Sequence, residues 1–378
     1  MASDVRSRVR RPKWVAVVAL VAVGAAVGVL VHLWLRPHPF QVIWQARTLG
    51  PIVCPPLVAD QRVFVASSDG TVRCFDQRTG ASLWMSTAPL LASRVTPVLH
   101  GGVLIVCSDA NRVCGLNPDD GTLQWEFRDA LGPIQSSPVV YQGVLFVAGD
   151  DGILRAVDTA TGKQVHGRKL PGYVAAGLAL SSGRVLVVPC GDGSILTFDM
   201  SAGPPPGNAE IPLRRYQTGA PVHSRPVAVG DSIYVGSDDG ALCRIDATTA
   251  RRVAHADDAI RSSLVTDEQR VYFGCNDGTL YAWSMAGETI TMAVPTGGPV
   301  RGAPVVADNV VYFGSSDGVL RAADASQGCV VLASLDLGSP ITGGLAMDGR
   351  RLYVGTEDGV LRCVASYVTT SELRKGGE

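Results

Sequence analysis

Basic side chains recur at one position of a segment that the 378-residue chain repeats eight times. This position lies three residues before the proline, or its equivalent, that opens each repeat. Its occupants are Val53, Arg94, Gln135, Ala175, His223, Arg261, Arg301 and Thr342. Converging guanidinium groups hold carboxylates or phosphates through charge-assisted hydrogen bonds. Each of the eight residues lies where the chain enters the innermost segment of its repeat, so we expect a site for an acidic loop or an anion at the central opening of the ring, with the partner-binding candidates Arg94, Gln135, His223, Arg261 and Arg301.

A structural role is the alternative for the same arginines. Each would then pair with an aspartate in a neighbouring turn and only hold adjacent repeats together. Residues 1–13 contain five basic residues and one acidic residue, whereas the whole chain has a net charge of −1, so the remainder is acidic. An acidic body argues against non-specific binding of nucleic acid, which needs a basic surface.

Residues for enzymatic or metal chemistry do not form a familiar motif. The six histidines are scattered, without the spacing of a zinc site, and the sequence has no G-x-S-x-G, H-E-x-x-H or phosphate-binding-loop motif. The nine cysteines form no C-x-x-C pair, and four fall within repeated strands, which favours buried thiols over disulfides. These four are Cys74, Cys114, Cys243 and Cys363. We expect no catalytic residue, no cofactor and no metal.

Each repeat is marked by a hairpin sequence such as VFVASSDGTVRCFD or VYFGSSDGVLRAAD. The turn residues are Gly70, Asn111, Gly152, Gly193, Gly240, Gly278, Gly318 and Gly359. Their spacings are 41, 41, 41, 47, 38, 40 and 41 residues, which fits the blades of a β-propeller and is too long for leucine-rich repeats. The longest spacing contains the insertion 201–212, whose three consecutive prolines predict a stiff loop.

The repeat predicts four strands. A short apolar segment with proline comes first, followed by a β-branched or aromatic strand such as VYFG. An Asp-Gly turn, expected to have positive φ at both central positions, leads to an alternating strand such as TVRCF, then to a second turn and a fourth strand such as SLWMS. The predicted fold is all-β, an eight-bladed β-propeller of four-stranded antiparallel blades over residues 42–366. The last repeat lacks a fourth strand, so residues 42–46 (VIWQA) are predicted to close the ring beside residues 361–365.

The two faces of such a ring carry different connections. Strands alternate in direction through a blade, so the Asp-Gly turns share one face with the links between blades. The candidate basic residues follow those links and belong to the same face. The second turns and the insertion 201–212 belong to the opposite face.

The N-terminal region predicts one transmembrane helix before the propeller. Residues 1–13 form a basic tail, and residues 14–35 are an almost uninterrupted apolar run. At about 1.5 Å per residue, this run crosses a bilayer core of about 30 Å. A cleaved signal peptide is the alternative, although its apolar region usually has only about 7–15 residues.

The basic tail also predicts the orientation. The positive-inside rule keeps the tail in the cytoplasm and exports the chain after a linker of residues 36–41. The expected location is the cytoplasmic (inner) membrane, with the propeller on the periplasmic or extracytoplasmic side and residues 367–378 as a C-terminal tail. Gly24 and Gly28 form a G-x-x-x-G pair, which makes them candidates for packing two such helices.

The second turn and fourth strand resemble the repeat of the pyrroloquinoline-quinone (PQQ) family. The pattern A-x-D-x-x-T-G-x-x-x-W is matched by CFDQRTGASLW, ending at Trp84, and by GLNPDDGTLQW, ending at Trp125. His166 replaces the tryptophan in the third repeat. The resemblance covers about residues 40–366. Eight-bladed members include quinoprotein alcohol dehydrogenases and BamB-type outer-membrane assembly proteins.

The BamB-type resemblance implies a non-catalytic, membrane-anchored scaffold for protein partners in the cell envelope. BamB-type proteins are lipid-anchored, whereas no cysteine closely follows the apolar run of this chain. A PQQ-dependent oxidoreductase is one alternative, but those enzymes hold the quinone with adjacent cysteines and a calcium ion, and this sequence has no Cys-Cys pair. A second alternative is an extracytoplasmic sensor or ligand-binding domain with a separate signalling partner, since PQQ-type repeats also occur in membrane kinases.

Overall fold

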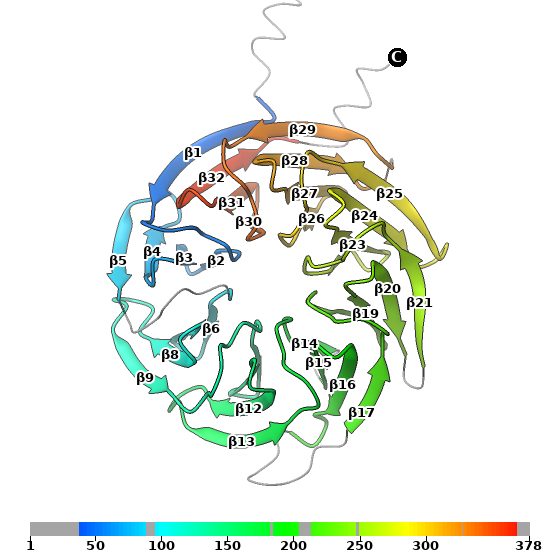
Figure 1. Cartoon of the computed structure of the whole chain (residues 1–378). Helices are drawn as coiled ribbons and strands as arrows, with labels where there is room; N and C mark the ends of the chain where they lie inside the picture. Colours follow the sequence, from blue (N-terminus) through cyan, green and yellow to red (C-terminus); the bar gives the residue numbers. More distant parts are fainter. Residues whose placement is uncertain are drawn as a thin grey trace, which may run out of the picture. The chain divides into compact units, whose positions relative to one another are not determined.

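The computed structural model describes residues 38–87, 95–181, 184–203, 213–246, 249–326 and 328–368. The chain divides into two units, Met1–Pro39 and Phe40–Glu378. In the second unit, eight four-stranded antiparallel sheets form the blades of a ring, so the predicted eight-bladed propeller is confirmed (Figure 1). Within the described ranges, no helix is long and apolar enough to cross a membrane. The apolar run 14–35, with Gly24 and Gly28, lies outside these ranges.

Each blade runs from its innermost to its outermost strand. Blade 1 consists of β2 Leu57–Ala59, β3 Arg62–Ala66, β4 Val72–Asp76 and β5 Ser82–Ser86, and blade 2 of β6 Val98–His100, β7 Val103–Ser108, β8 Arg112–Leu116 and β9 Leu123–Phe127. Blade 3 consists of β10 Val139–Tyr141, β11 Val144–Ala148, β12 Ile153–Asp158 and β13 Gln164–Lys169, and blade 4 of β14 Ala179–Ser181, β15 Val185–Pro189, β16 Ser194–Asp199 and β17 Leu213–Gln217. Blade 5 consists of β18 Val227–Val229, β19 Ser232–Gly236, β20 Ala241–Ile245 and β21 Ala250–His255, and blade 6 of β22 Val265–Thr266, β23 Arg270–Gly274, β24 Thr279–Ser284 and β25 Thr289–Pro295. Blade 7 consists of β26 Val305–Ala307, β27 Val310–Gly314, β28 Val319–Asp324 and β29 Val331–Asp336, and blade 8 of β30 Leu345–Asp348, β31 Arg351–Gly355, β32 Val360–Ser366 and β1 Phe40–Arg47.

The ring closes through β1, which is the outermost strand of blade 8. It pairs antiparallel with β32, beginning with Phe40 opposite Ser366. The closing strand expected at residues 42–46 lies within β1. The linker expected at residues 36–41 is too long, because β1 already begins at Phe40.

The burial of each strand follows from its place in the blade. The second strands, such as β11 and β19, are buried at nearly every residue because neighbouring blades cover both faces of the sheet. The outermost strands alternate, as in β5, where Trp84 is buried and Leu83 is exposed. The hydrophobic cores therefore lie between blades, and one of them joins Phe64 of blade 1 to Leu104 of blade 2.

The cysteines fit into these cores. All nine are free thiols; eight are buried, including the four predicted within strands, and Cys329 is exposed. Burial raises the pKa of the Cys54 thiol to about 12, so this group stays neutral at physiological pH.

The Asp-Gly turns differ from the expected two-residue hairpin. In blade 1, Gly70 has a φ of 82° while Asp69 keeps a negative φ, and the Gly70 amide donates to the Ser67 carbonyl at 3.1 Å. This is a three-residue loop, a type I turn followed by one left-handed residue. Asn111, with a φ of 62°, takes the left-handed place in blade 2. The expectation of positive φ at both positions is wrong, and the aspartate contributes through its side chain instead.

Tryptophans on outermost strands connect neighbouring blades. Trp125 in β9 donates its indole N–H to the carbonyl of Thr159 in blade 3, at 2.9 Å. Its ring lies on Gly162, where a Cβ would come within 2.5 Å of the indole. Trp44 and Trp84 make the same contacts with blades 1 and 2. The Thr-Gly of the PQQ-type repeat is thus explained, because only glycine leaves room for the preceding blade's tryptophan.

Candidate functional site

The links between blades share one face of the ring with the Asp-Gly turns, as expected. In blade 1, the amide of Ser68 in the turn donates to the carbonyl of Pro51 in the link, at 2.9 Å. The amide of Ser316 donates to the carbonyl of Pro299 in the same way, also at 2.9 Å. We call the surface formed by these turns and links the Asp-Gly face.

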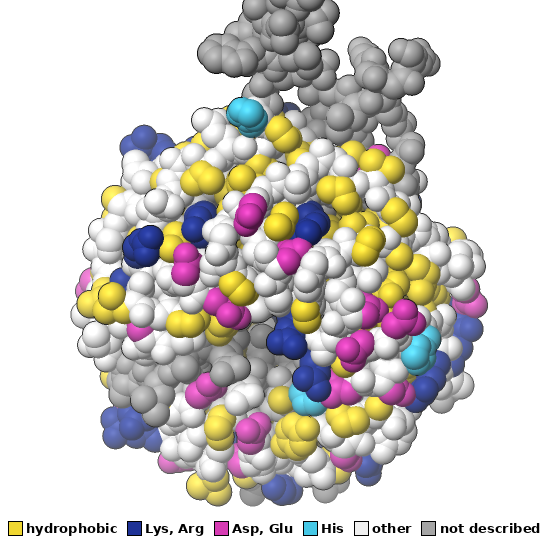
Figure 2. Space-filling view, turned by 45° about the horizontal axis from the view of Figure 1, so that its top comes forward, with side chains coloured by type: hydrophobic (Ala, Val, Ile, Leu, Met, Phe, Trp, Pro, Cys, Tyr) yellow, Lys and Arg dark blue, Asp and Glu magenta, His cyan; other side chains and the backbone are white. Residues whose placement is uncertain are grey.

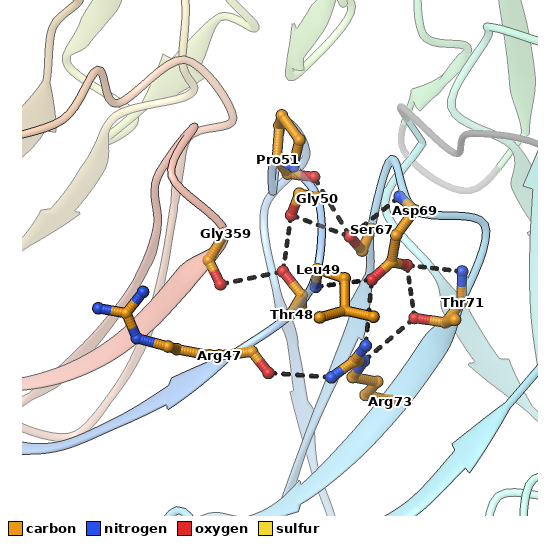
Figure 3. Close-up of polar contacts among 10 residues, drawn as sticks. All are labelled: Arg47, Thr48, Leu49, Gly50, Pro51, Ser67, Asp69, Thr71, Arg73 and Gly359. Atoms are coloured by element: carbon orange, nitrogen blue, oxygen red, sulfur yellow. Dashed lines mark hydrogen bonds and ion pairs between the residues drawn. The ribbon is translucent and has the colours of Figure 1, made fainter.

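A carboxylate in each of several turns fixes the adjoining link. Asp69 accepts hydrogen bonds from the backbone amides of Leu49, at 2.8 Å, and Thr71, at 2.9 Å (Figure 3). The Arg73 guanidinium lies 3.1 Å from the same carboxylate and donates onward to the Arg47 carbonyl at 2.9 Å. Burial acts to raise the pKa of Asp69, but these hydrogen bonds and the Arg73 charge hold it below its ordinary value. The ionised carboxylate therefore joins the link out of blade 8 to blade 1.

The same arrangement recurs elsewhere in the ring. Asp151 accepts from the Leu131 amide at 3.0 Å and pairs with Arg155 at 2.5 Å. Asp317 pairs with Arg321 at 2.6 Å. These arginines stand four residues after the aspartate, on the third strand of the blade, and are not the candidate basic residues. The repeated carboxylate–arginine pairs belong to the construction of the Asp-Gly face.

Two leucines held by these carboxylates project into solvent. Leu49 is 90% exposed and Leu131 is 81% exposed. They occupy the same position of the link, which is leucine again at Leu90, outside the described residues, and glycine at Gly219, Gly297 and Gly338. An apolar side chain repeated at one exposed position is a stronger sign of an interaction surface than a single exposed leucine. The sequence analysis missed these residues, although leucine at one link position in three successive repeats was a visible signal.

Two predicted residues meet at one carboxylate of this face. Nδ1 of His223 lies 2.9 Å from Oδ2 of Asp238, and Arg261 donates to both carboxylate oxygens at 3.0 and 2.9 Å. The ring of Tyr173, from the link into blade 4, lies 6.2 Å from the His223 ring between centroids. Burial acts to raise the pKa of Asp238, but the bonds from Arg261 and His223 lower it. For Arg261, the structure therefore agrees with the alternative of pairing with a turn aspartate.

The other predicted residues have different surroundings. Arg301 is exposed and donates from Nε to the neutral amide oxygen of Asn276 at 3.1 Å, and no carboxylate of the described residues pairs with it. Gln135 is half-buried on the link into blade 3, and Arg94 lies outside the described residues. Basic and histidine side chains lie beside the central hollow, with acidic ones around them (Figure 2). The surface is therefore of mixed charge, whereas the sequence predicted converging cations.

The described side chains of the Asp-Gly face can bind another molecule through apolar contacts and through charge. In the part of the chain that the structure describes, no three His, Cys, Asp or Glu side chains gather as a metal site would require. The described groups are apolar side chains on fixed backbone, an aromatic ring and guanidinium groups. Such a set suits recognition of another molecule.

The fold and its Asp-Gly and tryptophan contacts define a PQQ-like repeat β-propeller. The family model described as outer membrane protein assembly factor BamB matches residues 35–128, 68–291 and 253–361. The chain belongs to this family.

Curated relatives carry the same description. Outer membrane protein assembly factor BamB of Yersinia pestis is 26% identical over 267 residues, which is 66% of each chain. The protein of that name from Moranella endobia is 25% identical over 257 residues, or 63% of each chain. The chain therefore spans less than two thirds of the length of these relatives.

Two solved structures show the same fold. BamB from Moraxella catarrhalis has a TM-score of 0.71 at 19% identity, covering 87% of this chain and 98% of its own. The computationally designed Ika8 protein has a TM-score of 0.73 at 16% identity, covering 86% and 99%. At such low identity the likeness shows the fold alone.

Proposed function

We propose that this protein is a non-catalytic scaffold of the cell envelope that binds outer-membrane proteins or their assembly partners through its Asp-Gly face. Membership of the BamB family supports the envelope role, and the relatives' description as assembly factors supports the class of partner. The observation that carries the proposal is the pair Leu49 and Leu131, which Asp69 and Asp151 hold in exposed positions.

The composition of the face supports a protein partner. Burying a leucine side chain contributes about 1.5–3 kcal/mol. Tyr173, which is 41% exposed, and the exposed Arg301 are of the residue types enriched where interfaces bind most strongly. Because Asp69 and Asp151 already fix the link backbone, little conformational freedom remains to be lost on binding.

The proposal includes an anchor. We propose that residues 14–35 span the cytoplasmic membrane, leave residues 1–13 in the cytoplasm and hold the propeller on the extracytoplasmic side. The length of the apolar run and the basic tail before it support this arrangement. Such a helix would replace the lipid anchor of BamB-type proteins.

Site-specific photo-crosslinking in living cells tests the partner and the face together. A photo-reactive amino acid at position 49 or 131 of the full-length chain should form crosslinks to an outer-membrane β-barrel or assembly subunit, identified by mass spectrometry. Leu83 and Leu123, which are 51% and 45% exposed on the outermost strands β5 and β9, are matched controls and should not.

The same two pairs serve for substitution. Leu49→Ser with Leu131→Ser should weaken co-purification of that partner about tenfold or more, since contact leucines are lost. Leu83→Ser with Leu123→Ser should leave co-purification unchanged. Equal crosslinking from both pairs, or full binding by the Leu49 and Leu131 double variant, would exclude the Asp-Gly face as the binding surface.

A further inference from the structure

Arg225 lies where the innermost segments of three blades meet. It precedes β18 of blade 5, and its backbone carbonyl accepts a hydrogen bond from the Leu264 amide of blade 6 at 3.1 Å. Its side chain crosses to blade 4, where Nε donates to the Leu178 carbonyl at 3.2 Å. The innermost strands, β18 among them, surround the middle of the ring (Figure 1), and Arg225 stands two residues before β18.

The position of the Arg225 side chain is set by its surroundings. A Cβ on Gly177 would lie 2.8 Å from Cγ of Arg225, so the arginine stem needs glycine beneath it. The bond from Nε to Leu178 then holds the guanidinium on that side of the opening. Nε makes the only hydrogen bond between this guanidinium and the described residues, so its two terminal nitrogen atoms have no partner among them.

The charge of Arg225 has no counter-ion among the described residues. No carboxylate of the described ranges pairs with it, and the surrounding protein lowers the pKa of the guanidinium by desolvation although the side chain remains exposed to solvent. The equivalent residues of the other repeats are all neutral, namely Pro55, Thr96, Ser137, Gly177, Ser263, Ala303 and Gly344. Arg225 is thus a single cation in a ring of uncharged residues.

An arginine in this setting has a specific physical meaning. A solvent-exposed cation that pairs with no carboxylate of the described residues keeps its charge available to an arriving anion. The planar fork of a guanidinium matches two oxygens of a carboxylate or phosphate group. Arg301, which has only the neutral Asn276 as partner, adds positive charge on the Asp-Gly face.

We propose that the central opening of the propeller is a binding site for a small oxyanion, with a phosphate or carboxylate group held by the Arg225 guanidinium. Gly177 and Leu178 position that guanidinium, and Arg301 attracts the anion toward the opening. This site differs from the protein-binding surface around Leu49 and Leu131 and does not depend on it.

Thermal unfolding of the full-length protein at constant ionic strength tests the site. With chloride as reference, inorganic phosphate or succinate should raise the Tm of the unmodified protein with a saturating dependence on concentration, because ligands of the folded state stabilise it. The two anions distinguish a phosphate site from a carboxylate site. Arg225→Gln should abolish the rise, and in chloride its Tm should equal or exceed that of the unmodified protein.

Two further variants secure the assignment. Gly177→Ala displaces the guanidinium without removing it and should weaken the apparent affinity for the anion about tenfold or more, since a well-oriented charged bond is lost. Arg251 lies on the outermost strand β21, is exposed and pairs with Glu288. The Arg251→Gln protein should therefore retain the full rise in Tm with the anion.

Three results would overturn the proposal. One is the absence of a saturable rise with either anion. Another is an equal rise in the Arg225→Gln and unmodified proteins, which would indicate a general salt effect. The third is a lower Tm of Arg225→Gln in chloride with the anion response intact, which would make Arg225 a structural residue. None of these would bear on crosslinking from Leu49 and Leu131.

Discussion

At the scale of the residue, the carboxylate–arginine pairs of the Asp-Gly turns differ in burial. Asp151 and Arg155 have side chains only 6% and 3% exposed and lie 2.5 Å apart. Asp358 and Arg362 hold the same positions in blade 8, but Asp358 is 40% exposed and the distance is 3.8 Å. The same sequence pattern therefore produces one buried ion pair and one that water screens.

Removing the acidic partner of each pair should reveal this difference. Asp151→Ala leaves Arg155 buried without its counter-ion and should lower the free energy of unfolding by about 3–5 kcal/mol. Asp358→Ala serves as the matched control and should cost at most about 1 kcal/mol, as exposed pairs do. Denaturant unfolding followed by circular dichroism measures both. Similar losses for the two variants would show that burial does not govern these pairs.

At the scale of the element, β1 joins the two ends of the propeller. It supplies the outermost strand of blade 8, and its Trp44 donates to the Gln77 carbonyl of blade 1 at 3.1 Å. Without β1, β32 would present an unpaired edge, which is a template for aggregation. Ring closure thus depends on a strand far from its partner in sequence.

Two truncations separate the roles of β1 and the preceding residues. A chain that begins at residue 36 retains β1 and should stay folded, with an unchanged Tm, but should leave the membrane fraction. A chain that begins at residue 48 also lacks β1 and should have a lower Tm and aggregate. Thermal unfolding, light scattering and membrane fractionation give the readouts. Equal Tm values for the two chains would mean that β1 does not stabilise the ring.

At the scale of the whole molecule, the same turn carboxylate recurs around the ring, so the contributions of single carboxylates to stability add up. The aspartate directly before the turn glycine has a pKa below its ordinary value in six blades, at Asp69, Asp151, Asp192, Asp239, Asp317 and Asp358. Burial acts to raise these pKa values, but hydrogen bonds to the carboxylates and the nearby arginines outweigh the effect of burial. A group whose pKa is depressed by folding stabilises the folded state above its unfolded pKa and loses this contribution as the pH falls.

The propeller should therefore be sensitive to acid. Its Tm should be nearly constant from neutral pH to about pH 5 and fall progressively below the unfolded aspartate pKa of about 3.9. Asp69→Asn, which cannot titrate, should reduce the steepness of this fall while lowering the Tm at pH 7. Calorimetry across this pH range provides the measurement. A Tm that rises below pH 4 would contradict the assigned direction.

The sequence by itself determined the number of blades, the four strands of each and the position of the closing strand. These features depend on signals within a single repeat, namely alternation of apolar residues and glycine at turns, and on the regular spacing between repeats. The conformation of the Asp-Gly turn was predicted wrongly, because a two-residue and a three-residue hairpin share the same residues and only the register of the flanking strands separates them.

Only the tertiary structure decided what the basic residues contact. Arg261 and His223 meet at Asp238, whereas Arg301 meets the neutral Asn276, and the two arginines lie 23 and 25 residues from these partners. Sequence position identified Arg261 and Arg301 as equivalent, yet Arg261 meets a charged residue of the preceding turn, Asp238, and Arg301 a neutral one, Asn276. The exposure of Leu49 likewise depends on a bond to Asp69 in the next blade, which packing of the complete ring creates.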